Sequence, residues 1–125
     1  MIKVKRAYEE PGDGDGRRYL VDRLWPRGRT KDSLKLDGWL KDVAPSQSLR
    51  RWFNHDTKKW DEFRQKYFDE LNAKPEGLEL LIETARKGHI TLIYGAHDTE
   101  HNNAVALAEY LKKKTARQTV QKKKS

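Results

Sequence analysis

The sequence predicts a single compact α/β domain in which a small, mostly parallel sheet is covered by about five helices. Three short apolar segments have the pattern of strands, and the chain between the second and the third is helical in pattern as far as residue 88. A crossover of that length returns a strand to a parallel position in the same sheet. The length of 125 residues fits one domain.

The strands are predicted from periodicity and from the breakers around them. Residues 2–8 alternate apolar and basic side chains, as strands do, and residues 9–18 form a glycine-rich turn without the later glutamate of a calcium loop. Residues 19–25, "YLVDRLW", predict a second strand that "PRGRTKDS" ends. The most apolar run, residues 89–96, "HITLIYGA", predicts a central strand.

The predicted helices follow from apolar spacing and end signals. Residues 36–43 carry Leu36, Trp39, Leu40 and Val43 on one helical face, and Ser46 is a good cap for a helix over residues 47–54. Three further helices are predicted in the same way. The first has Asp56 or Thr57 as its cap and the apolar face Trp60, Phe63, Tyr67 and Leu71. The second lies between Pro75 and Gly88 with the face Leu78, Leu81, Ile82 and Ala85, and the third has Asp98 or Thr99 as its cap and the face Ala104, Leu107, Ala108 and Leu111.

Charge divides the chain into a domain of residues 1–111 and a basic tail of residues 112–125 that we expect to be disordered. The tail holds seven of the 27 Lys and Arg residues and no acidic residue, which leaves 20 basic against 19 acidic residues in the domain. The formal net charge of +8 therefore belongs mostly to the tail. The tail is able to contact nucleic-acid phosphates, whereas the domain is not a basic nucleic-acid-binding domain.

Composition also restricts compartment and chemistry. The chain has no cysteine, which removes disulfides, thiolate metal sites and cysteine nucleophiles. It has neither an apolar run long enough to span a membrane nor a signal-peptide pattern at its start. We therefore expect a cytoplasmic protein without a membrane partner, and the sequence sets no oligomeric state.

Two polar segments are predicted to meet at one edge of the sheet. "RLWPRGR" follows the second strand and "YGAHDTEHNN" follows the third, and ligands of open parallel sheets bind beyond the carboxyl ends of the strands. A helix N-terminus with nearby arginines favours a carboxylate or phosphate ligand. The ligand-binding candidates are Asp22 to hold an arginine, Trp25 to wall the pocket, Arg27 to contact the anion, and Arg23 and Asn102.

The acid–base candidates are His55, Asp98 and His101, but no spacing selects a reaction, so whether the protein is an enzyme stays open. His97 and His101 are four residues apart, and His55 could supply a third metal ligand. "HDTEH" nevertheless lacks the glutamate that follows the first histidine in zinc proteases. We therefore predict no metal and no cofactor.

Five stretches, "LVDRLWPRG", "WLKDVAPS", "LRRWFNHD", "FRQKYFDEL" and "TLIY…D…HNNA", resemble the bacterial YeaO-like family, a domain of unknown function. The resemblance covers residues 2–111 and implies a compact cytoplasmic α/β domain without an assigned activity. The family usually has lysine at the position of His97, which argues further against a metal. A related group has a cysteine–histidine–arginine motif near this turn, and its thiol chemistry does not transfer to a chain without cysteine.

Three classes of function remain open. The first is an enzyme or binding protein for a small anionic ligand at the sheet edge. The second is a nucleic-acid-binding module that uses the tail and the arginines, for which steep salt dependence would be diagnostic. The third is an interaction or scaffold protein without a ligand, for which Arg23 and Arg27 should both lie in solvent.

Overall fold

The computed structural model describes the backbone of residues 1–124 and the side chains of residues 1–116. This part of the chain forms a four-stranded parallel sheet with five α-helices, so the predicted fold class is confirmed. The strands are β1 (Ile2–Arg6), β2 (Arg17–Leu20), β3 (Gly38–Trp39) and β4 (Ile90–Tyr94). The helices are α1 (Lys31–Leu34), α2 (Gln47–Phe53), α3 (Trp60–Ala73), α4 (Leu78–Lys87) and α5 (Asn103–Lys124), and short 3-10 turns cover Asp13–Asp15, Lys41–Val43 and Thr57–Lys59.

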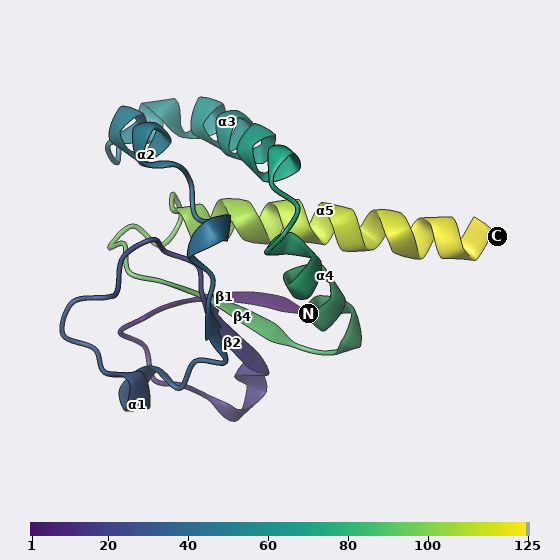
Figure 1. The fold of residues 1–125 in the computed structure, drawn as a ribbon, viewed down its shortest axis with the longest axis horizontal. Coiled ribbons are helices and arrows are strands. Elements are labelled where there is room, and N and C mark those ends of the chain that lie inside the picture. Colours follow the sequence, from purple (N-terminus) through teal and green to yellow (C-terminus); the bar gives the residue numbers. More distant parts are fainter. Residues whose placement is uncertain (125) are drawn as a thin grey trace.

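Strand β4 is the centre of the sheet, as the sequence predicts. The strand order is β1-β4-β2-β3, with Ile2 opposite Ile90 on one side and Arg17 opposite Ile90 on the other. All five side chains of β4 are buried. Because every pairing is parallel, the carboxyl ends of β1, β2 and β4 lie at one edge, from which the chain continues into α5 (Figure 1).

Both faces of β4 are covered, and the alternation of its side chains assigns them to two clusters. Ile90, Leu92 and Tyr94 join the main core with residues of α2, α3, α4 and α5. Ile93 faces the other way and packs with Leu20, Leu34 and Ala7 under α1. This two-sided burial explains why the strand reads as a continuous apolar run.

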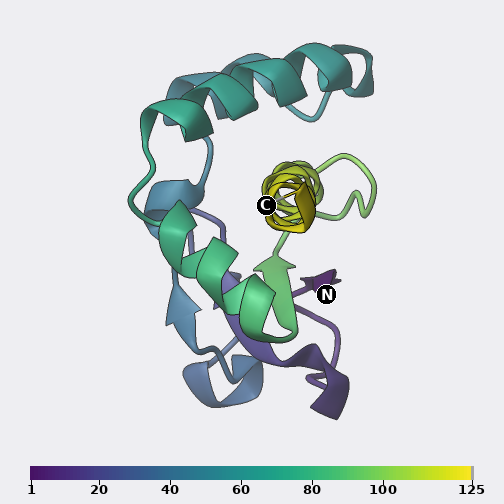
Figure 2. The same cartoon turned by 90° about the vertical axis from the view of Figure 1, so that its right-hand side faces the viewer.

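The helices on the main side form two layers over the sheet. Helix α5 lies between the sheet and the α2–α3 pair, and α4 lies beside α5 (Figures 1 and 2). Beyond the first turns, α5 extends past the rest of the domain (Figure 1). In the described part of the chain, no helix is both long and apolar enough to cross a lipid bilayer.

The segment predicted as a helix over residues 36–43 is instead β3 followed by a 3-10 turn, so this prediction was wrong. The segment pairs with β2: Asp37 N–H donates to the Arg18 carbonyl, Arg18 N–H donates to the Asp37 carboxylate, and Leu40 N–H donates to the Leu20 carbonyl. Trp39 packs on the α1 side and Leu40 on the main core, the alternation of a strand. An open edge of β2 was available, and pairing there overrode the helical spacing.

The second predicted strand, residues 19–25, is shifted and shortened to Arg17–Leu20. Val21 still donates its N–H to the Ile93 carbonyl, but Asp22 then turns its carboxylate to the β4 end of the sheet. The first strand similarly stops at Arg6 rather than residue 8. Polar contacts at the sheet edge thus end both strands earlier than the apolar pattern indicates.

The remaining helices agree with the sequence. Ser46 caps α2 by accepting from Leu49 N–H, and the predicted apolar stripe of α3 faces the core. Helix α5 begins later than predicted, with Asn102 rather than Asp98 or Thr99 as its cap. It shows no break at Leu111 and continues to Lys124. The side chains after Ala116 and residue 125 lie outside the described residues, so disorder there stays a prediction.

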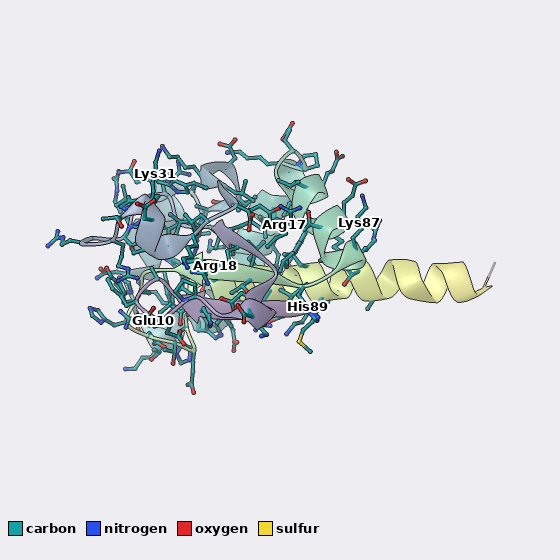
Figure 3. All side chains as sticks on the ribbon, turned by 90° about the horizontal axis from the view of Figure 1, so that it is seen from below. Glu10, Arg17, Arg18, Lys31, Lys87 and His89 are labelled. Atoms are coloured by element: carbon teal, nitrogen blue, oxygen red, sulfur yellow. The ribbon has the colours of Figure 1, made fainter. Side chains whose placement is uncertain are left out.

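The glycine-rich turn before β2 is organised by a buried ion cluster. Asp15, 2% exposed, accepts from Arg18, 4% exposed, at 2.5 Å and from Lys5 at 3.0 Å. Arg18 lies near the middle of the α1 side, whereas Arg17 lies toward the amino ends of the strands (Figure 3). Gly16 has φ of +64°, and a Cβ there would meet the His89 carbonyl oxygen at 2.0 Å, so only glycine fits.

Burial alone would raise the pKa of Asp15, but the Gly12 N–H, Lys5 and Arg18 together lower it below its ordinary 3.8. Such a carboxylate contributes stability above the pKa of the unfolded chain and loses it as the pH falls through the folded pKa. Replacement by a neutral group also leaves the guanidinium of Arg18 buried without its counter-charge.

We therefore expect Asp15→Asn to lower the free energy of unfolding at pH 7 by about 3 kcal/mol, the scale for breaking a buried ion pair. The deficit should shrink at pH 3, below the ordinary pKa of 3.8, because the carboxylate of the unfolded chain is then largely protonated. Urea unfolding at both pH values measures this. Asp13→Asn, at an exposed carboxylate of the same turn, is the control and should change stability by less than about 0.5 kcal/mol. Equal losses in the two variants would contradict the role of the cluster.

Candidate functional site

The carboxylate of Asp22 joins three segments at the carboxyl edge of the sheet. One oxygen accepts from Gly95 N–H at 2.8 Å, just beyond β4, and the other accepts from Asn103 Nδ2 at 3.0 Å, in the first turn of α5. Asn103 Nδ2 also donates to the Val21 carbonyl at 3.1 Å. Burial raises the pKa of Asp22 against the opposing effects of these donors and the positive charge of Arg50. Asp22 thus holds the ends of β2 and β4 and the start of α5 together.

A cavity of about 510 Å³ opens beside this junction, between the loop after β2, helix α2 and the start of α5. These elements lie on one side of the domain, at the left in Figure 1. The cavity is lined by one carboxylate, three arginines, two histidines, several amides and an apolar wall. Its charged and imidazole-bearing residues are Asp22, Arg23, Arg50, Arg51, His55 and His101.

The three arginines reach the cavity from two elements, and Arg50 and Arg51 are exposed. None of the three forms a close ion pair within the described residues, although the charge of Arg50 acts on Asp22. Arg23 donates only a long bond, 3.4 Å from Nη2 to the Pro45 carbonyl, and its Nε is buried without a hydrogen-bond partner. Arg50 and Arg51 lie in the last turn of α2, and neither guanidinium has an ion pair or hydrogen bond within the described part of the chain. Arginine presents a planar fork of donors, which suits carboxylate and phosphate groups.

Asp98 orients His101 at the cavity wall. Its carboxylate contacts His101 Nδ1 at 3.0 Å, and the other oxygen accepts from the N–H groups of Glu100 and His101. These backbone donors, then His101 itself, lower the pKa of Asp98. The His101 ring also meets Trp60 edge-on, with 5.3 Å between the ring centres. Nε2 is therefore the ring nitrogen left for a ligand or a proton.

His55 and Asn102 both line the cavity. His55 has a strained backbone, whereas Asn102 is held by hydrogen bonds of its side chain. Asn54 and His55 follow α2 in the left-handed region, with φ of 46° and 56°. Two consecutive non-glycine residues in this region are uncommon and carry backbone strain. Asn102 is buried, with Oδ1 accepting from Val105 N–H and Nδ2 donating to the Asp98 carbonyl, so both ends of its amide hold the start of α5.

The structure brings together Asp22, Arg23, His55, His101 and Asn102 of the residues predicted from the sequence. Asp98 lies behind His101 rather than on the cavity wall, and it orients the ring.

Trp25 and Arg27, the other two predicted residues, do not line the cavity. Trp25 packs edge-on against Trp39 on the α1 side, with 5.3 Å between ring centres, and donates Nε1–H to the Arg29 carbonyl. The side chain of Arg27 is exposed, and its carbonyl accepts from the Tyr8 hydroxyl. A role for Arg27 in ligand binding stays a prediction.

Sequence reasoning missed Arg50, Arg51 and Asn103. The two arginines belong to "LRRWFNHD", whose apolar spacing explained the helix and left the arginines without an assigned role. Asn103 stands in "HNN", next to Asn102, which the sequence predicts as a ligand-binding residue. Adjacent arginines without an acidic residue three or four positions away were the available signal.

The described residues contain no group of three or more His, Asp and Glu side chains placed to hold a metal ion. His97 is exposed and does not line the cavity with His101. The polar groups of the cavity lining are guanidinium, imidazole and amide groups and the one carboxylate of Asp22.

Comparison with known proteins finds relatives of similar length. The chain is 40% identical over 111 residues to the uncharacterized protein YeaO of Escherichia coli K12, which covers 89% of this chain and 96% of YeaO. It is 38% identical over 110 residues to the uncharacterized protein Rv3073c of Mycobacterium tuberculosis H37Rv, with 88% and 92% covered. No solved structure matches significantly.

A family model described as the inactive DUF488-N3 subclade matches residues 1–125. The match extends over the junction at Asp22, the arginines of α2 and the loop before α5. Together with the identity to YeaO, it shows that the chain belongs to the YeaO-like family, within the inactive DUF488-N3 subclade.

Proposed function

We propose that the cavity at the carboxyl edge of the sheet binds a small anionic ligand through a carboxylate or phosphate group. The observation that carries this proposal is the set of three arginines, Arg23, Arg50 and Arg51, which line one cavity and form no close ion pair within the described residues. A buried guanidinium nitrogen without a hydrogen bond costs free energy that an anionic ligand would recover. Asp22 is the one acidic side chain among the described lining residues, and Gly95 and Asn103 already occupy its oxygens.

Three further observations support ligand binding over the alternatives. The description of the matching subclade as inactive favours binding without turnover, in which His55 and His101 act as hydrogen-bonding groups toward the ligand. A scaffold without a ligand would leave Arg23 in solvent, whereas its side chain is half-buried at the cavity. The domain is nearly neutral, so the positive charge at the cavity is local.

Arg50→Gln is expected to weaken binding of inorganic phosphate about tenfold or more, because it removes one charge-assisted hydrogen bond. Arg23→Gln should have a similar effect. Isothermal titration at constant ionic strength measures both, and thermal unfolding checks that the variants fold.

The control for this titration is Arg86→Gln, at an exposed residue of α4 that does not line the cavity. Arg27→Gln in the same series tests the contribution that the sequence predicts for the turn after β2. If phosphate, sulfate and acetate all fail to bind the wild-type protein, or if Arg86→Gln weakens binding as much as Arg50→Gln, the proposal fails.

The basic tail favours a second candidate function, nonspecific binding of nucleic acid. Residues 112–125 carry seven basic and no acidic residues. If the tail binds phosphates of duplex DNA, replacing Lys122, Lys123 and Lys124 with Gln should flatten the plot of log affinity against log salt by up to about 0.9 per lost phosphate contact. Fluorescence anisotropy with a labelled duplex measures this slope.

A triple variant of the domain makes the same change in charge outside the tail. Its replaced residues are exposed lysines, namely Lys35, Lys58 and Lys87. It should leave the slope unchanged. An equal change in both triple variants would show that net charge, and not the tail, governs binding.

A further inference from the structure

We propose that the ligand is a phosphate monoester that carries an apolar, aromatic-sized body, and this inference rests on the proposed function. Charge is the first argument. Three arginines and one carboxylate line the cavity, which leaves an excess of about two positive charges. A monocarboxylate compensates one of these, whereas a phosphate monoester carries close to two negative charges at neutral pH.

The size of the cavity is the second argument. Its volume of about 510 Å³ lies within the range of about 300 to 1,000 Å³ typical of pockets for organic ligands. Inorganic phosphate would occupy a small part of it. The remaining space requires a body attached to the anionic group.

The apolar wall indicates what that body is. Leu24, Ala44, Pro45, Phe53 and Phe63 all line the cavity with the arginines. Leu24 is 64% exposed, so a large apolar side chain of the cavity lining is accessible to a ligand. Phe53 and Phe63 are 6% and 2% exposed, so the apolar surface that a ligand would remove from water belongs mainly to Leu24. The same cavity therefore offers charge for a phosphate and apolar surface for its ester group.

The polar groups complete the match to a phosphate. Asp98 occupies Nδ1 of His101, which leaves Nε2 as the ring nitrogen open to a ligand, and Arg23 Nε is a buried donor without an acceptor. A phosphoryl group has three terminal oxygens, enough for several donors at once. A carboxylate has two.

Titration with phenyl phosphate, inorganic phosphate and benzoate tests the inference. Phenyl phosphate should bind about tenfold more tightly than inorganic phosphate, because its ring is buried on the apolar wall. It should also bind more tightly than benzoate, which has the ring but one charge. Equal affinity for the two phosphates, or benzoate binding as tightly as phenyl phosphate, would overturn the inference and leave the proposed function standing. Absence of binding for every anion would overturn both.

Leu24→Ala supplies the matching variant. It should weaken phenyl phosphate about threefold or more and leave inorganic phosphate unchanged, because it removes apolar contact and no charge. Leu80→Ala is the control, since Leu80 is 47% exposed on α4 and does not line the cavity. Because both leucines are exposed, folding should be preserved. A Leu24→Ala variant that binds phenyl phosphate as tightly as the wild type would overturn the placement of the apolar body.

Discussion

The half-buried carboxylate of Asp22 is the interaction on which the arrangement of the site depends. It follows β2, accepts from the first N–H beyond β4 and holds the amide of Asn103 in α5. Without it, two partly buried donors would each lose an acceptor where the chain passes from the strands into α5, and only Asn103 would keep another, the Val21 carbonyl. The cost of burying this charge appears as a raised pKa, which the nearby Arg50 partly offsets.

The parallel sheet makes such a junction possible. Every pairing in the sheet is parallel, so β2 and β4 deliver their carboxyl ends to the same edge. The long helical crossover between these strands then places α2 over that edge, with its last turn and two arginines at the cavity. Helix α5 returns from the same edge and runs under α3, which closes the main core.

Several unfavourable features lie at this edge, although Arg18 and Arg29 also have buried guanidinium nitrogens without a hydrogen-bond partner in other parts of the domain. Arg23 has a buried nitrogen without a partner, and Asn54 and His55 have left-handed backbones beside the cavity. Elsewhere, β4 is buried on both faces, and the deeply buried Asp15 is fully paired. Backbone strain and unpaired donors are common at binding sites, where a ligand can supply the missing hydrogen-bond acceptors.

The sequence by itself determined the α/β class, the central strand and the helices whose apolar side chains recur at a regular spacing, because these depend on local periodicity and end signals. It also placed Asp22, Arg23, His55, His101 and Asn102 near one edge, because parallel strands share their carboxyl ends. Only the tertiary structure decided that residues 38–39 are a strand, since a free edge of β2 outweighed helical spacing. It likewise placed Trp25 in the α1-side cluster and brought Arg50 and Arg51 to the cavity. These outcomes depend on how a helix and a loop far apart in the chain pack together, which no local pattern encodes.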